Sequence, residues 1–118
     1  MDRKVTRIFT GPDGQSHFED MDLPMSKENP TRGRTEATTA TSVYFLEFSP
    51  GYERSWHHAP QRQMVVTLQG EGEVQIGDGT RRRFGPGDIM LAEDKTGQGH
   101  FSHVVSKVPR KMMVVTLE

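Results

Sequence analysis

The residues of this chain best suited to chemistry are His57, His58, Gln63 and His100. The two adjacent histidines precede a proline turn in the stretch SWHHAPQRQMVV, Gln63 opens the apolar run after that turn, and His100 follows the glycine-rich stretch GQG. Imidazole nitrogens bind zinc, copper, iron and nickel, and a glutamine carbonyl is an oxygen ligand that carries no charge. Imidazole also titrates near neutral pH, which suits it to acid–base catalysis without a metal. Three possibilities follow: a metal site, a metal-free acid–base site, or polar groups of a cavity that only satisfy one another.

Short strands must position these residues. Strand-forming runs recur at intervals of roughly 8–12 residues between glycine- and proline-rich turns, which is typical of a β-sandwich or β-barrel. No stretch has a sustained helical period. The predicted strands span residues 5–9, 17–23, 41–48, 53–58, 63–69, 73–76, 81–84, 89–92, 100–106 and 111–117.

These strands predict one all-β domain over residues 1–118, with N-terminal strands and a loop in residues 1–40 and the barrel itself in residues 41–118. Residues 25–40, MSKENPTRGRTEATTA, are polar and aperiodic and predict a loop, which could act as a lid. The runs MVV at 64–66 and MMVV at 112–115 are apolar at consecutive positions, so both faces of these strands should be covered. A second sheet or a second subunit could cover the outer face, and we expect a homodimer.

Composition excludes several classes of function. The chain has no cysteine, which rules out disulfides, thiolate zinc sites and cysteine nucleophiles. Its formal net charge is −1, which gives no footprint for nucleic acid, and the run Arg81–Arg83 predicts a solvated strand face. The N-terminus lacks the apolar core of a signal peptide and no apolar run is long enough to cross a bilayer, so we expect a soluble cytoplasmic protein without membrane partners.

Strand alternation separates the histidines. Successive strand residues point to opposite faces, so His57 and His58 cannot both face the interior of a barrel. We expect His57 to point inward and His58 outward. The same rule excludes His103 from a site that contains His100.

The stretch from Gly51 to His103 resembles the two sequence motifs of the cupin superfamily. Gly51 is followed by five residues and then His57, and Gln63 is followed by six residues and then Gly70. The later stretch GPGD at 85–88, with His100 downstream, resembles the second motif, and WHHAPQRQ and AEDKTGQGH resemble a group of small single-domain bacterial cupins. The resemblance implies a small jelly-roll β-barrel with a site in its lumen.

The metal-binding positions depart from that family in part. Cupins commonly hold one divalent metal with two histidines, a glutamate and a later histidine. His57 matches the first histidine and His100 the last, whereas Ala59 stands at the second and Gln63 replaces the glutamate. The resemblance implies a zinc, iron, manganese or nickel site formed by His57, Gln63 and His100. Because the superfamily also includes metal-free epimerases and dehydratases, a site in which His57 acts as the base stays open.

The functional prediction is an enzyme that acts on a small polar organic molecule in the barrel lumen. Isomerase, lyase, cyclase and dioxygenase reactions all stay open, because a fold does not fix a reaction. Proton transfer is assigned to Glu93, just before the His100 loop, or to Tyr44, whose hydroxyl could hold a substrate oxygen. Glu93 and Asp94 could each orient an imidazole or act as a general acid. The alternative without catalysis is a small-ligand sensor or carrier.

Overall fold

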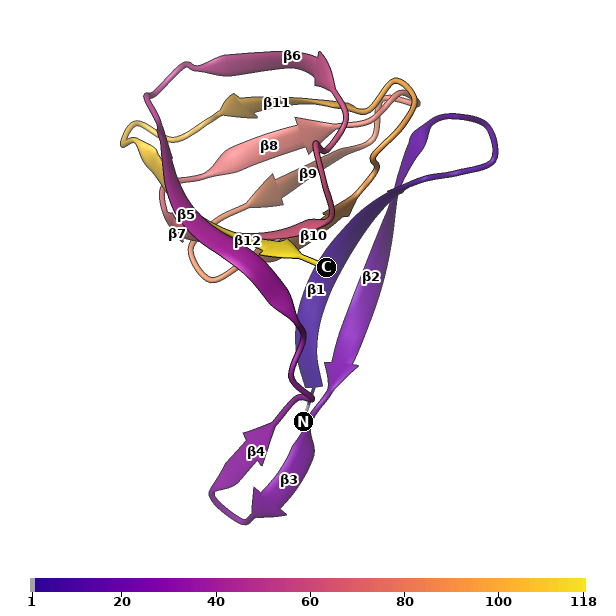
Figure 1. Cartoon of the computed structure of the whole chain (residues 1–118). Helices are drawn as coiled ribbons and strands as arrows, with labels where there is room; N and C mark the ends of the chain where they lie inside the picture. Colours follow the sequence, from indigo (N-terminus) through magenta and orange to yellow (C-terminus); the bar gives the residue numbers. More distant parts are fainter. Residues whose placement is uncertain (1) are drawn as a thin grey trace.

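The computed structural model describes residues 2–118, with side chains from Lys4 onward, and every regular element in this range is a β-strand (Figure 1). The strands are β1 (Asp2–Thr10), β2 (Ser16–Pro24), β3 (Ser26–Asn29), β4 (Arg32–Arg34), β5 (Ala40–Phe48), β6 (Glu53–His57), β7 (Gln63–Gln69), β8 (Gly72–Gln75), β9 (Arg81–Phe84), β10 (Ile89–Glu93), β11 (His100–Val104) and β12 (Arg110–Leu117). Within residues 2–118 there is no helix that could span a membrane.

Two sheets face each other and form the barrel in the upper part of Figure 1. The larger sheet has the order β2-β1-β10-β7-β12-β5, and the smaller one β6-β11-β8-β9. Val65 and Val114 from the larger sheet pack with Val74 and Phe84 from the smaller sheet in one buried cluster. The predicted all-β jelly-roll barrel is confirmed.

The N-terminal residues extend the barrel. β1 pairs with β2 on one side and, in parallel, with β10 on the other, so β1 is an interior strand of the larger sheet. A second apolar cluster, built on Val5, Leu91 and Leu117, packs against Met64 and Val115. The hairpin β1–β2 thus extends the larger sheet, and Val5 of β1 joins the apolar cluster of its neighbouring strands.

The prediction of a loop over residues 25–40 is wrong in its first half. Residues 26–34 form the β3–β4 hairpin, which projects away from the barrel (Figure 1). Its turn is stabilised by Asn29, whose side-chain oxygen accepts a hydrogen bond from the backbone N–H of Thr31 at 2.9 Å. All residues of both strands are exposed, so the hairpin has no buried face and leaves no alternating pattern in the sequence.

The outer face of edge strand β5 carries apolar side chains. Val43 is 56% exposed and Phe45 69% exposed. Apolar residues at the edge of a sheet are typical of an interface between chains. The homodimer stays a prediction.

Candidate functional site

A cavity of about 60 Å³ lies inside the barrel. Alternate residues of the strands line it, as period-two geometry requires: Val65 of β7, Ala92 of β10 and Val114 of β12 reach it from the larger sheet. Val74 and Ser102 reach it from the smaller sheet. The sequence-predicted ligand residues His57, Gln63 and His100 all line this one cavity.

Strand pairing brings the two imidazoles together. His57 ends β6 and His100 begins β11, and they are direct partners in the antiparallel ladder. Their ring centroids are 4.4 Å apart in an edge-on arrangement. Gly99 permits this approach: it has a φ of 75°, and a Cβ at this position would overlap the carbonyl oxygen of His57. The last glycine of the GQG stretch therefore allows His100 to lie beside His57.

A buried carboxylate holds His100 in place. Nδ1 of His100 lies 2.6 Å from Oδ2 of Asp94, which also accepts a hydrogen bond of 2.7 Å from the hydroxyl of Ser16. His100 is 5% exposed and Asp94 is fully buried. A carboxylate at Nδ1 fixes the ring's orientation and keeps the proton on that nitrogen, which leaves Nε2 as the free acceptor.

A backbone carbonyl does the same for His57. Its Nδ1 donates a hydrogen bond of 2.7 Å to the carbonyl oxygen of Ser55. Burial lowers the pKa of His57, and the neighbouring His100 and Arg54 lower it further, against the raising effect of the Ser55 carbonyl. His57 is therefore neutral at pH 7, with Nε2 as its free acceptor.

Gln63 supplies a third acceptor. Its Oε1 atom is buried and has no hydrogen-bond partner among the described residues. A buried carbonyl oxygen without a partner carries a desolvation cost, which a ligand can remove. Two imidazole nitrogens and one amide oxygen around one cavity form a set of lone pairs that a metal ion or hydrogen-bond donors can satisfy.

The positions beside His57 behave as alternation requires. His58 is exposed, does not line the cavity, and approaches only the carbonyl oxygen of Ala59 at 3.1 Å. Ala59 is 3% exposed and does line the cavity. Position 59 therefore faces the cavity with a methyl group, at the position that corresponds to the second histidine in the motif that the sequence resembles.

Glu93 lies away from the cavity, contrary to its predicted role in proton transfer. Its neighbour Ala92 faces the interior, so Glu93 points to the opposite face of β10. There Nε of Arg7 donates to Oε1 at 2.5 Å, and Arg62 donates to Oε2. Burial opposes ionisation, but the two arginines outweigh it and hold the pKa of Glu93 below its ordinary value. Glu93 is thus an ionised partner of two cations and cannot serve as a lumen acid.

Tyr44 does not line the cavity either. It is 39% exposed, whereas Leu46 and Phe48 on the same strand do line it. β5 is the last strand of its sheet, so solvent reaches its inner face at this position. The structure gives no contact between Tyr44 and the two imidazoles.

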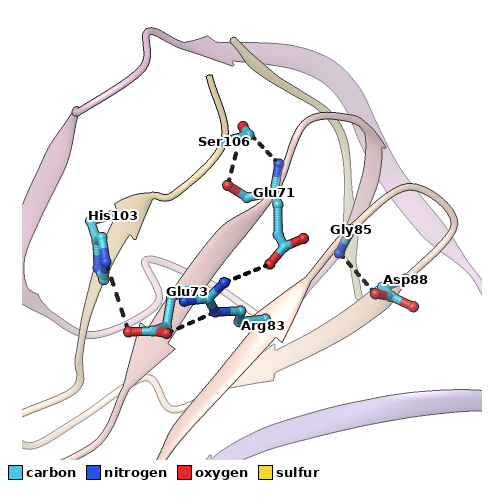
Figure 2. A network of polar contacts seen from close by, with 7 residues as sticks. All are labelled: Glu71, Glu73, Arg83, Gly85, Asp88, His103 and Ser106. Carbon is cyan, nitrogen blue, oxygen red and sulfur yellow. Dashed lines mark hydrogen bonds and ion pairs between the residues drawn. The ribbon is translucent and has the colours of Figure 1, made fainter. Parts of the chain in front are cut away.

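His103 lies outside the site, as expected. In Figure 2 it approaches Glu73 from the outer face of the smaller sheet, with Nε2 3.8 Å from Oε1. Arg83 holds the other oxygen of Glu73 at 3.1 Å and reaches Glu71 at 3.2 Å. Arg81 and Arg83 thus lie beside carboxylates on the outer face, whereas Arg82, on the opposite face of β9, pairs with Asp20 of β2.

Sequence reasoning missed the cations of the cavity. Arg110, at the start of β12, and Arg54, on β6, both line it. Arg110 is 5% exposed, and Arg54 is exposed at the mouth. Parity puts Arg110 on the same strand face as Met112 and Val114, but the apolar run at 112–115 does not show from the sequence that this face turns inward.

The donor set can be tested against the metal that cupins commonly hold. In the described part of the chain no group of three or more His, Asp or Glu side chains could hold a metal ion. The set present is two imidazoles and an amide, whose atoms suit a borderline divalent metal but contribute no negative charge. The orphaned Oε1 of Gln63 and the fixed Nδ1 protons of both rings agree with such a site. The donor atoms of these three side chains are thus of types that a divalent metal accepts, without a negative charge to offset its own.

Comparison with known proteins supports the fold. No protein-family model matches the chain, and no curated protein sequence is similar to it. Among solved structures, a cupin 2 conserved barrel domain protein from Salinispora arenicola is 18% identical, with a TM-score of 0.55 over 80% of this chain and 73% of that chain. A conserved protein with a double-stranded β-helix domain from Klebsiella pneumoniae is 24% identical, with a TM-score of 0.54 over 80% and 82% of the two chains. The cupin domain of Cnp3 from Schizosaccharomyces pombe is 12% identical, with a TM-score of 0.54 over 99% and 84%.

The chain therefore has the fold of a small cupin barrel. These similarities establish the architecture. The chemistry has to be argued from the cavity.

Proposed function

We propose that this chain is a small cupin enzyme that binds a divalent metal through His57, Gln63 and His100 and acts on a small polar organic molecule in the barrel. The observation that carries the proposal is the set of three acceptor atoms around one cavity, of which the Gln63 oxygen is buried without a partner. A bound metal would supply Lewis-acid polarisation of a substrate oxygen.

The chain's own residues perform the remaining tasks. Asp94 and the Ser55 carbonyl fix the two rings so that both keep a free Nε2. The apolar wall formed by Val65, Val74 and their neighbours excludes bulk water and strengthens polar interactions inside. The small cavity restricts the substrate to a few non-hydrogen atoms unless it extends through the mouth.

Metal content tests the proposal. Protein purified without added metal, then equilibrated separately with zinc, iron(II), manganese and nickel, should retain one of these in near-stoichiometric amount by elemental analysis. His57→Ala and His100→Ala should lose it, because each removes an imidazole ligand. His58→Ala and His103→Ala are matched controls, since neither side chain lines the cavity. Retention of metal in His57→Ala, or no binding of any of the four ions, would refute the metal site.

A metal-free acid–base enzyme is the second candidate, and the contact between Asp94 and His100 favours it. A buried carboxylate at Nδ1 stabilises the imidazolium that forms when Nε2 takes a proton from a substrate. His57 is the other candidate base, and its lowered pKa keeps it unprotonated. Turnover that survives complete removal of metal, and is lost in His100→Ala, would favour this mechanism over the metal-dependent one.

A further inference from the structure

Arg110 is a buried cation without a carboxylate partner. It is 5% exposed, and one of its Nη atoms donates a hydrogen bond of 3.0 Å to the hydroxyl of Thr67. Its Nε is buried and has no partner. Burial alone lowers the pKa of Arg110 to about 10, with no opposing contribution from any acid. The guanidinium therefore stays charged at neutral pH and lacks the compensation that buried charges require.

Other arginines of the described chain that approach the barrel do have that compensation. Arg7 and Arg62 share the carboxylate of Glu93, and Arg83 bonds Glu71 and Glu73 on the outer surface (Figure 2). Glu71, Glu73 and Glu93 thus pair with arginines outside the barrel, whereas Asp94 is buried and bonds His100. None of the residues that line the cavity is an aspartate or a glutamate.

The absence of a side chain at Gly72 leaves space for the guanidinium of Arg110 inside the barrel. Gly72 of β8 lies against it: a Cβ there would meet the Nη1, Cζ and Nε atoms of Arg110 at 2.5–2.8 Å. Arg54 adds a second positive charge at the mouth of the same cavity. Arg54 and Arg110 are thus the arginines among the residues that line the cavity, and no acidic residue lines it to offset them.

We propose that Arg110 is the receptor for the carboxylate of a short-chain organic acid, bound in the cavity that also holds His57, Gln63 and His100. The guanidinium offers planar, paired N–H donors that match a carboxylate. Val65, Val74 and Met112 provide an apolar wall for a short carbon chain. A cavity of about 60 Å³ holds about four to six water-sized groups, which corresponds to acids of the size of propionate or lactate. The inference rests on the proposed function, because it names the substrate class for the same cavity.

The test compares acids with their amides, which have nearly the same shape and no charge. Protein is freed of metal with a phenanthroline chelator, since carboxylate chelators would compete for the site. Acetate, propionate and lactate are titrated against acetamide, propionamide and lactamide in a carboxylate-free buffer at constant ionic strength. We expect the acids to raise the unfolding temperature, by roughly 5 °C at tenfold their dissociation constant, and to shift the ¹⁵N resonance of the Arg110 Nε–H group. The amides should do neither.

Variants separate Arg110 from general charge effects. Arg110→Met should abolish both responses to the acids, and Arg110→Lys should keep a weakened response because it retains charge without the planar fork. Arg83→Met, on the outer face, should respond like the wild type. Equal responses to acids and amides, or an undiminished response in Arg110→Met, would overturn the inference.

The outcome is independent of the metal site. Acid-specific binding by the metal-free protein supports the carboxylate receptor even if elemental analysis finds no metal. Stoichiometric metal with no preference for acids would leave the proposed metal site in place and refute the role of Arg110.

Discussion

Replacing Arg110 with methionine should make the protein more stable. The folded state lowers the pKa of this guanidinium from its ordinary value to about 10, which corresponds to a cost of about 3 kcal/mol for the charged side chain in the folded protein. Methionine has a similar length, carries no charge and suits an irregular apolar space. The variant loses the hydrogen bond to Thr67, which offsets about 1 kcal/mol. The net expectation is a gain of roughly 2 kcal/mol in the free energy of unfolding.

The pH dependence gives a second measure of the same quantity. The pKa of Arg110 is lower in the folded state, so the unfolded chain binds more protons once the pH exceeds the folded-state value of about 10. The cost of the buried charge is therefore fully present at neutral pH and decreases as the pH rises through the folded-state value of about 10. The stability advantage of Arg110→Met should accordingly be largest at pH 7 and should shrink above pH 10.

Urea denaturation at pH 7, followed by fluorescence of the single tryptophan Trp56, measures the change. Arg83→Met is the matched control of opposite sign, because it removes the bonded partner of the buried carboxylate of Glu73 and should lower stability. If Arg110→Met is less stable than the wild type, the guanidinium is a net stabilising part of the core. The reasoning that it is kept for a ligand at a cost in stability would then be refuted.

Three further predictions concern the site itself. Ala59→His should lower the dissociation constant for metal, because position 59 faces the cavity and a third imidazole would join the set; an unchanged constant in a metal titration would contradict this placement. Gly99→Ala should destabilise the fold by about 2 kcal/mol or more and weaken metal binding, because a side chain at this position forces β11 away from His57. Wild-type stability of this variant in urea would disprove the close approach of the two strands. Glu93→Gln should leave metal content unchanged and lower stability at pH 7. Because the folded state lowers the pKa of Glu93, its contribution is present above pH 4.5 and lost as the pH falls through the folded-state value, so the two proteins should converge in acid.

Much of this fold was readable from the sequence because the barrel follows a period of two. Strands β7 and β9 begin and end at the predicted residues, since each is bounded by turn-forming residues. The placement of His57 inward and His58 outward follows from the same alternation. The β3–β4 hairpin was not readable, because a hairpin exposed on both faces has no hydrophobic pattern.

The site was readable only in part. The resemblance to the cupin motifs pointed to His57, Gln63 and His100, but the roles of the acids depended on which face of β10 turned inward. Glu93 and Asp94 are adjacent in the sequence, and the structure shows that Asp94 is the one that bonds the imidazole of His100. Arg110 was hidden for a related reason. Its strand is apolar at consecutive positions, so the pattern did not reveal which residues share the interior with it.

The hydroxyl of Ser16 connects the N-terminal strands to the proposed site through its hydrogen bond to Asp94. Ser16 lies at the start of β2, outside the stretch that resembles the conserved cupin motifs, yet it bonds the carboxylate that fixes His100. The adjacent turn also meets the His100 loop, where the N–H of Gln98 donates to the carbonyl of Gly14 at 3.4 Å. A shortened chain that starts at Ala40 would keep every proposed ligand and lose this support. Trimming the N-terminal hairpin to make a smaller catalyst would thus remove part of the scaffold of the imidazole itself.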